Sequence, residues 1–171
     1  IKVLGYDRNG PVLKVAEALE DGRLRFEQEM GRQVLILQRS SDLVGVDIAA
    51  IEAAGIRIGI STHSIAELDI ALGMDPDYVA LGPIYPTMLK AMPWAPQGLD
   101  RIAEWRSKIS CPLVAIGGIT LGRAPDVLAA GASSAAVVTD IVMSDDPEQR
   151  TREWIAVTDP WRNLSTGRPQ S

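Results

Sequence analysis

Short, almost continuously apolar segments alternate with segments whose apolar residues recur at helical spacing along most of the chain. The apolar segments predict strands at 1–6, 34–37, 56–61, 78–84, 112–117 and 135–141. The spaced pattern predicts helices at 12–20, 48–54, 65–72, 99–108, 124–130 and 147–157. Strands that are apolar on both faces are typical of a parallel sheet covered by helices. The alternation therefore predicts an α/β fold, either doubly wound or closed into a barrel.

The number of predicted strands bounds the fold further. The pattern supplies six strands at most, whereas a closed parallel barrel has eight and usually needs at least ~200 residues. The chain has 171 residues, and the shortfall lies before Asp42. We therefore expect residues 1–157 to form one domain whose N-terminal part is incomplete. Residues 158–171 contain Pro, Gly, Ser and Asn, and we expect this tail to fray.

Composition limits the classes of partner. Hydrophobic residues make up 46% and charged residues 23% of the chain, which is typical of a globular protein. The net charge is −5 and the chain has no basic run, so we do not expect nucleic-acid binding. Because the overall field opposes anions, any anionic ligand must be held by local donors.

Cysteine usage and hydropathy bear on location. Cys111 is the one cysteine and cannot form an internal disulfide, which fits a reducing cytoplasm. Its apolar surroundings in the sequence indicate a buried structural residue. No apolar run is long enough for a membrane helix, and the N-terminus lacks the layout of a signal peptide. We therefore expect a cytoplasmic protein with no membrane partner.

Two predicted strand ends are candidates for phosphate binding, because parallel barrels carry their sites at the C-terminal ends of strands. Gly117-Gly118 follows one strand, and a glycine pair lets backbone N–H groups approach a ligand closely. Val138-Thr139 lies at the end of the last predicted strand. Counted back from the C-terminus, both ends occupy places where such barrels commonly bind phosphate. The alternative is a tight turn with ordinary capping.

The loop after the strand at 78–84 contains Lys90 among several prolines. A single lysine in a loop is usually solvated, but the length of this loop and its place at the functional end favour contact with an anion. Trp94, in the same loop, either packs over a ligand or anchors the loop. His63, the one histidine, is either an acid–base group or a hydrogen-bonded structural residue. Ser61 lacks a Gly-x-Ser-x-Gly elbow, so we do not expect hydrolase chemistry.

Several motifs recur in one known family. They are Gly59-Ile-Ser-Thr-His63, Tyr78-Val-Ala-Leu-Gly-Pro-Ile-Tyr-Pro-Thr87, Lys90, Ala95-Pro-Gln-Gly-Leu99, Val114-Ala-Ile-Gly-Gly-Ile-Thr120, Ala129-Ala-Gly-Ala132 and Ala136-Val-Val-Thr-Asp-Ile141. Together they resemble the thiamine-phosphate synthase family over about residues 42–154. Gly-Pro-Ile-Tyr-Pro-Thr before a lysine is specific, whereas many phosphate-binding barrels share the glycine pair.

The resemblance implies a TIM-type (β/α)8 barrel and a transferase of thiamine biosynthesis. Such an enzyme condenses hydroxymethylpyrimidine diphosphate with hydroxyethylthiazole phosphate by dissociative substitution, and diphosphate leaves. The resemblance places Ser61 beside the pyrimidine, and Thr87 and Lys90 on the diphosphate. Lys90 and Ser61 would then be the catalytic residues.

The remaining implied contacts concern the second phosphate and the metal. The resemblance assigns the thiazole phosphate to Gly117, Gly118, Val138 and Thr139. It also implies a Mg²⁺ cofactor, with Asp42 as a metal ligand. The resemblance implies two small-molecule partners, the pyrimidine diphosphate and the thiazole phosphate. A homo-oligomer is possible, and the sequence leaves it open.

Two departures from the family pattern keep alternatives open. Leu89 stands where the family has a second threonine in the diphosphate segment, so a hydroxyl donor is absent there. The upstream glutamine-leucine-arginine and asparagine-aspartate motifs are also absent. The alternatives are a thiazole tautomerase of the same family, which would need His63, and a non-catalytic phosphate-binding barrel. Tyr85-Pro86-Thr87 before Lys90 favours the synthase.

Overall fold

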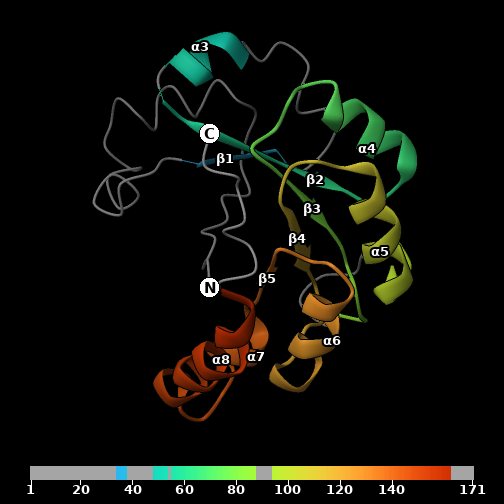
Figure 1. The fold of residues 1–171 in the computed structure, drawn as a ribbon. Helices are drawn as coiled ribbons and strands as arrows, with labels where there is room; N and C mark the ends of the chain where they lie inside the picture. The colour runs from blue at the N-terminus through green and yellow to red at the C-terminus, as the bar shows by residue number, and fades with distance from the viewer. Residues whose placement is uncertain (1–33, 38–47, 54, 88–93, 163–171) are drawn as a thin grey trace. The chain divides into compact units, whose positions relative to one another are not determined.

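A computed structural model describes residues 34–37, 48–53, 55–87 and 94–162 (Figure 1). The chain divides into two compact units, a first unit of residues 5–80 and a second unit of residues 81–171 together with 1–4. The strand predicted at 1–6 and the helix predicted at 12–20 lie outside the described residues.

The first unit is built of strands that alternate with helices. Its described elements are β1 (Val34–Leu37), α3 (Ile48–Ala53), β2 (Arg57–Thr62), α4 (Ile65–Leu72) and β3 (Tyr78–Leu81), whose last residue is counted with the second unit. Strand β1 pairs in parallel with β2, so that Val34 lies opposite Arg57 and Leu37 opposite Ile60. The strands follow one another in the sheet in chain order. This parallel α/β arrangement confirms the predicted fold class.

The core of the first unit lies on one face of β2. Ile58 and Ile60 are 2% and 1% exposed, and they cluster with Ile56 and Ala71. Ile48, Ile51 and Met74 pack against this cluster. Because side chains alternate across a strand, the neighbouring residues Gly59 and Ser61 belong to the opposite face. Burial of the isoleucines therefore turns Ser61 away from this core.

Helix α4 begins where the sequence predicts. The Ser64 hydroxyl accepts a hydrogen bond from the Glu67 backbone N–H at 3.2 Å, so Ser64 is the N-cap. The Glu67 carboxylate reaches back and accepts a bond from the His63 backbone N–H at 2.6 Å. This reciprocal arrangement resembles a capping box, and it holds the end of β2 against the start of α4.

The second unit contains the remaining elements. They are α5 (Gly98–Lys108), β4 (Leu113–Ile116), the 3₁₀ turn η2 (Leu121–Arg123), α6 (Ala124–Ala129), β5 (Ser134–Ala136), α7 (Thr139–Val142) and α8 (Pro147–Arg162). Strand β4 pairs in parallel with β5, and the last pair is Ile116 opposite Ala136. Trp105 and Trp154 are 0% and 1% exposed and anchor the helices. Helix α7 lies beside α8 (Figure 1).

Three predicted boundaries differ from the structure by three or more residues. The strand predicted at 135–141 ends at Ala136, and residues 139–142 are helical instead. A short apolar run does not distinguish a strand from a buried helix, so the sequence pattern missed this change. Strand β3 ends at Leu81 because Pro83 has no N–H with which to continue the ladder. Helix α8 runs on to Arg162, past the predicted end at residue 157.

Candidate active site

The glycine pair forms a tight turn directly after β4. Gly117 has a φ of 94° and Gly118 a φ of 65°. Both values lie in the left-handed region, which glycine adopts without the steric cost that a Cβ imposes. The predicted glycine turn is therefore present, and its conformation depends on both glycines.

The segment after β3 lies directly against this turn. The Ile84 N–H donates to the Ile116 carbonyl at 2.9 Å, and the Tyr85 N–H donates to the Gly117 carbonyl at 3.0 Å. A Cβ built on Gly118 would lie 2.5 Å from the Pro86 carbonyl oxygen. The glycine pair is therefore needed for close approach of two backbone segments as well as for its turn.

The same segment closes into a loop. The Gln97 N–H donates to the Pro83 carbonyl at 2.7 Å, and the Gly98 N–H donates to the Ile84 carbonyl at 3.0 Å. Both ends of the loop are thus joined beside the glycine turn. Thr87 is half-buried within it, and Lys90 lies outside the described residues. Trp94 is half-buried near the end of the loop.

Arg123, the last residue of η2, lies against the glycine turn. The Arg123 guanidinium donates to the Gly118 carbonyl at 2.8 Å and lies 4.4 Å from the centroid of the Tyr85 ring. Such stacking of a guanidinium on an aromatic face adds a modest attraction at an exposed site. Arg123 therefore links the turn to the segment 83–86.

The end of β5 lies at the same edge of the sheet as the glycine turn. Because Ile116 pairs with Ala136, the residues that follow each of them leave neighbouring parallel strands on the same side. Val138, the N-cap of α7, is 41% exposed, and Thr139 is half-buried. The structure thus brings the two predicted phosphate-binding strand ends together.

Asp140, which the residue pattern does not single out, joins these two ends. Its Oδ2 accepts a bond from the Leu121 N–H at 3.3 Å and from the Trp154 Nε1–H at 2.8 Å. Leu121 begins η2, three residues after Gly118. The only sequence signal was the position of Asp140 next to Thr139.

Ser61 and His63 belong to the first unit. Ser61 is half-buried near the end of β2. The His63 side chain is 9% exposed, and its Nδ1 lies 3.0 Å from the Glu67 carboxylate. This burial and this hydrogen bond support the structural interpretation of His63.

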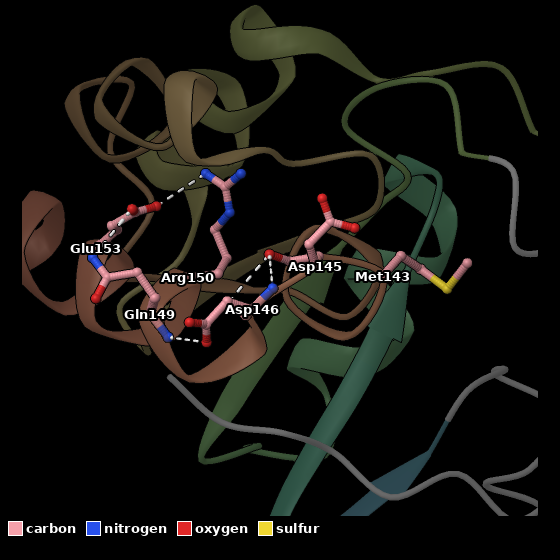
Figure 2. Close-up of a pocket in the computed structure, with 7 residues that line it drawn as sticks. Met143, Asp145, Asp146, Gln149, Arg150 and Glu153 are labelled. Carbon is pink, nitrogen blue, oxygen red and sulfur yellow. Dashed lines mark hydrogen bonds and ion pairs between the residues drawn. The ribbon is translucent and has the colours of Figure 1, made fainter.

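A pocket of about 360 Å³ lies in the second unit, and none of the predicted site residues lines it. Figure 2 shows its lining, which comes from the loop after α7 and from the start of α8. Asp145, Asp146 and Glu153 outnumber the single cation, Arg150, whose Nη1 lies 3.2 Å from the Glu153 carboxylate. An excess of carboxylates disfavours anions, so this pocket does not suit a phosphate.

Metal-binding side chains do not gather in the part of the chain that the structure describes. No group of three or more His, Cys, Asp or Glu residues there could hold an ion. Asp42, the predicted ligand, lies outside the described residues. In the same described part, no helix is both long enough and apolar enough to cross a membrane.

The chain is similar to a known protein family over more than half of its length. The family model described as thiamine monophosphate synthase matches residues 36–141, which include the glycine turn and Thr139. The chain belongs to the thiamine monophosphate synthase family. This membership confirms the resemblance read from the motifs.

Individual relatives of the thiamine monophosphate synthase family agree with this assignment. The thiamine-phosphate synthase of Rhizobium etli is 60% identical over 124 residues, 72% of this chain and 61% of that protein. The synthase of Salmonella paratyphi B is 49% identical over 117 residues, 68% of this chain and 56% of that protein. The chain thus spans about three fifths of the length of these relatives.

A solved structure supports the same fold. The thiamine phosphate pyrophosphorylase of Pyrococcus furiosus superposes with a TM-score of 0.65 at 23% identity, covering 91% of this chain and 81% of that one. At this identity the likeness concerns the fold. The parallel α/β fold of the chain is therefore that of its family.

Proposed function

We propose that the chain is a thiamine-phosphate synthase, a transferase that joins a pyrimidine diphosphate to a thiazole phosphate. The observation that carries the proposal is the direct packing of the segment 83–86 on the glycine turn. That segment leads into Thr87 and Lys90, which the family resemblance associates with the diphosphate. Family membership and 60% identity to the Rhizobium etli synthase support the same function.

The proposed reaction needs two anionic substrates held side by side. The bond between the pyrimidine methylene carbon and the diphosphate oxygen breaks, and its electron pair leaves with the diphosphate. The thiazole nitrogen then donates its lone pair to that carbon and forms the new carbon–nitrogen bond. A site that holds both groups in reacting geometry replaces a bimolecular encounter by a local one. The contact between the segment 83–86 and the glycine turn suits this requirement, because we propose that the two substrates bind next to them.

Each segment has a proposed role. Backbone N–H groups of Gly117, Gly118, Val138 and Thr139 hold the thiazole phosphate, because turns and strand ends of this kind present unpaired donors to an anion. This local arrangement matters because the net charge of −5 repels anions at long range. Arg123 beside Gly118 adds a positive charge close to the turn.

The leaving group has its own proposed contacts. The Thr87 hydroxyl donates to the diphosphate, and the Lys90 ammonium offsets the charge that grows as the carbon–oxygen bond breaks. We also propose that Ser61 lies beside the pyrimidine. Leu89 has no hydroxyl, so the dependence on Lys90 is greater than in a relative with threonine there.

Mg²⁺ is the proposed cofactor, with Asp42 as a ligand. A bound Mg²⁺ offsets diphosphate charge, because it is a hard cation that prefers carboxylate and phosphate oxygens. No metal-binding group is found among the described residues, so this proposal rests on the family resemblance and on Asp42. The cytoplasm is the proposed location, and both substrates are small molecules.

A coupled assay tests the proposal. We expect the chain to form thiamine phosphate and diphosphate only when both substrates and Mg²⁺ are present. Turnover of the thiazole phosphate to an isomer without the pyrimidine would support the tautomerase instead. Binding of the thiazole phosphate without any turnover would support the non-catalytic barrel.

Replacement of Lys90 tests the diphosphate site. We expect Lys90→Ala to lower turnover by roughly 10²–10³, because the ammonium stabilises charge that develops in the transition state. Affinity for the thiazole phosphate, measured by calorimetry, should change little. Lys108→Ala, an exposed lysine at the end of α5, is the matched control and should keep full turnover. A change of less than threefold for Lys90→Ala would place Lys90 on the solvated surface.

A further inference from the structure

We infer that Asp140 is a positioning residue for the thiazole phosphate, which it serves by tying together the two backbone segments that bind it. This inference rests on the proposed function, because it deepens the assignment of the same phosphate site. Asp140 need not touch the substrate itself.

The carboxylate of Asp140 is held by groups from two elements, η2 and α8. Besides the Leu121 N–H at the start of η2 and the Trp154 Nε1–H of α8, the Arg150 Nε lies 3.9 Å from Oδ2. The Asp140 side chain is 16% exposed, and Trp154 is 1% exposed. A carboxylate with several donors in a mostly buried setting has one preferred orientation.

These bonds lie where the strand ladder stops. Strands β4 and β5 pair as far as Ile116 and Ala136, and the phosphate-binding residues follow this last pair. The bond from Leu121 to Asp140 links the two segments again beyond it. It therefore holds the spacing between the glycine turn and Thr139, on which simultaneous contact with one phosphate depends.

The charge of Asp140 is not what the site requires. A carboxylate near a phosphate repels it, and the donors around Asp140, including Arg150, offset that repulsion. What the two segments need is an acceptor oxygen at the position of Oδ2. An asparagine can place an amide oxygen there, whereas an alanine cannot.

The experiment compares Asp140→Ala with Asp140→Asn in steady-state turnover with both substrates. For Asp140→Ala we expect the KM for the thiazole phosphate to rise roughly tenfold, because a partly buried donor pair loses its acceptor. The KM for the pyrimidine diphosphate should stay within about twofold. Asp140→Asn should restore the thiazole phosphate KM to within about threefold of the wild-type value. This split between substrates and rescue by asparagine would not follow from a general loss of stability.

Two further variants keep the test decisive. Asp146→Ala is the matched control, because the Asp146 Oδ1 also accepts a backbone N–H, from Gln149 at 2.9 Å, at the start of α8 away from the strand ends. It should leave both KM values unchanged. If Asp140→Ala does not fold, Trp154→Phe removes one donor and keeps an aromatic ring. It should raise the thiazole phosphate KM by roughly two- to fivefold.

The outcomes separate this inference from the proposed function. If the wild-type chain neither turns over nor binds thiazole phosphate by calorimetry, both are overturned. If the wild type binds and reacts while Asp140→Ala keeps its thiazole phosphate KM, only the inference is overturned. Equal loss of both substrates in Asp140→Ala, or failure of Asp140→Asn to restore the KM, also overturns the inference alone.

Discussion

Gly59 in the first unit and Gly118 in the second are both closely covered, but by different kinds of neighbour. A Cβ on Gly59 would lie 2.0 Å from Cζ of the Tyr78 ring. A Cβ on Gly118 would lie 2.5 Å from the Pro86 carbonyl oxygen. The first glycine makes room for a side chain that has torsional freedom. The second makes room for backbone that is itself hydrogen-bonded to the turn.

The two strand ends that carry predicted site residues differ in the same way. At the end of β2, side chains make the connections: the Thr62 hydroxyl donates to the Ala80 carbonyl at 3.0 Å, and His63 meets Glu67. At the end of β4, backbone groups make the connections to the segment 83–86, through Ile116 and Gly117, and only Arg123 adds a side-chain bond to the turn among the described residues. Backbone N–H groups suit the binding of a phosphate, whereas a strand end lined by side chains suits selective contact with a substrate ring. The comparison therefore predicts how each region responds to substitution.

Gly118→Ala should have the largest effect. We expect the free energy of unfolding to fall by about 2–5 kcal/mol, because a left-handed alanine costs roughly 1–2 kcal/mol and backbone overpacking about 1–3 kcal/mol more. Chemical denaturation measures the change. Gly122→Ala is the matched control, since nothing lies within 4 Å of its added Cβ. Equal stabilities of the two variants would show that the segment 83–86 moves aside freely. The contrast between Gly118 and Gly59 would then not hold.

Gly59→Ala should have an intermediate effect of about 1–3 kcal/mol, because the Tyr78 ring must move but the backbone need not. Combining it with Tyr78→Leu removes the ring and should recover part of the loss. A double-mutant cycle, read by denaturation, should give a coupling energy of at least about 0.5 kcal/mol. Strictly additive losses would argue that the ring does not determine the need for glycine.

Thr62→Val should have the smallest effect, a loss of about 0.5–1.5 kcal/mol, because valine keeps the shape of threonine but lacks the hydroxyl that bonds to Ala80. Thr151→Val is the control, because the Thr151 hydroxyl donates to the Pro147 carbonyl near the surface. It should stay within about 0.5 kcal/mol of the wild type. Thermal unfolding of both variants measures the loss of stability. Thr62 is 0% exposed, so an equal loss of stability in Thr151→Val would show that burial does not strengthen the Thr62 bond.

Much of the local structure could be predicted because its causes are local. Ser64 caps α4 through Glu67, three residues away, and the sequence pattern contains both. The helix at 65–72 is confirmed at both ends. The end of β5 could not be predicted, because an apolar run satisfies a strand and a short buried helix equally well. Packing of α7 beside α8 selects the helix there.

For this protein the sequence by itself determined the parallel α/β class, the glycine turn and the family motifs, because each depends on residue types at short spacing. Only the tertiary structure decided which strand ends meet. The bonds from Leu121 and Trp154 to Asp140 join residues 19 and 14 positions apart. No local pattern encodes such bonds, because the partners come together only when β4 pairs with β5 and α8 packs beside α7.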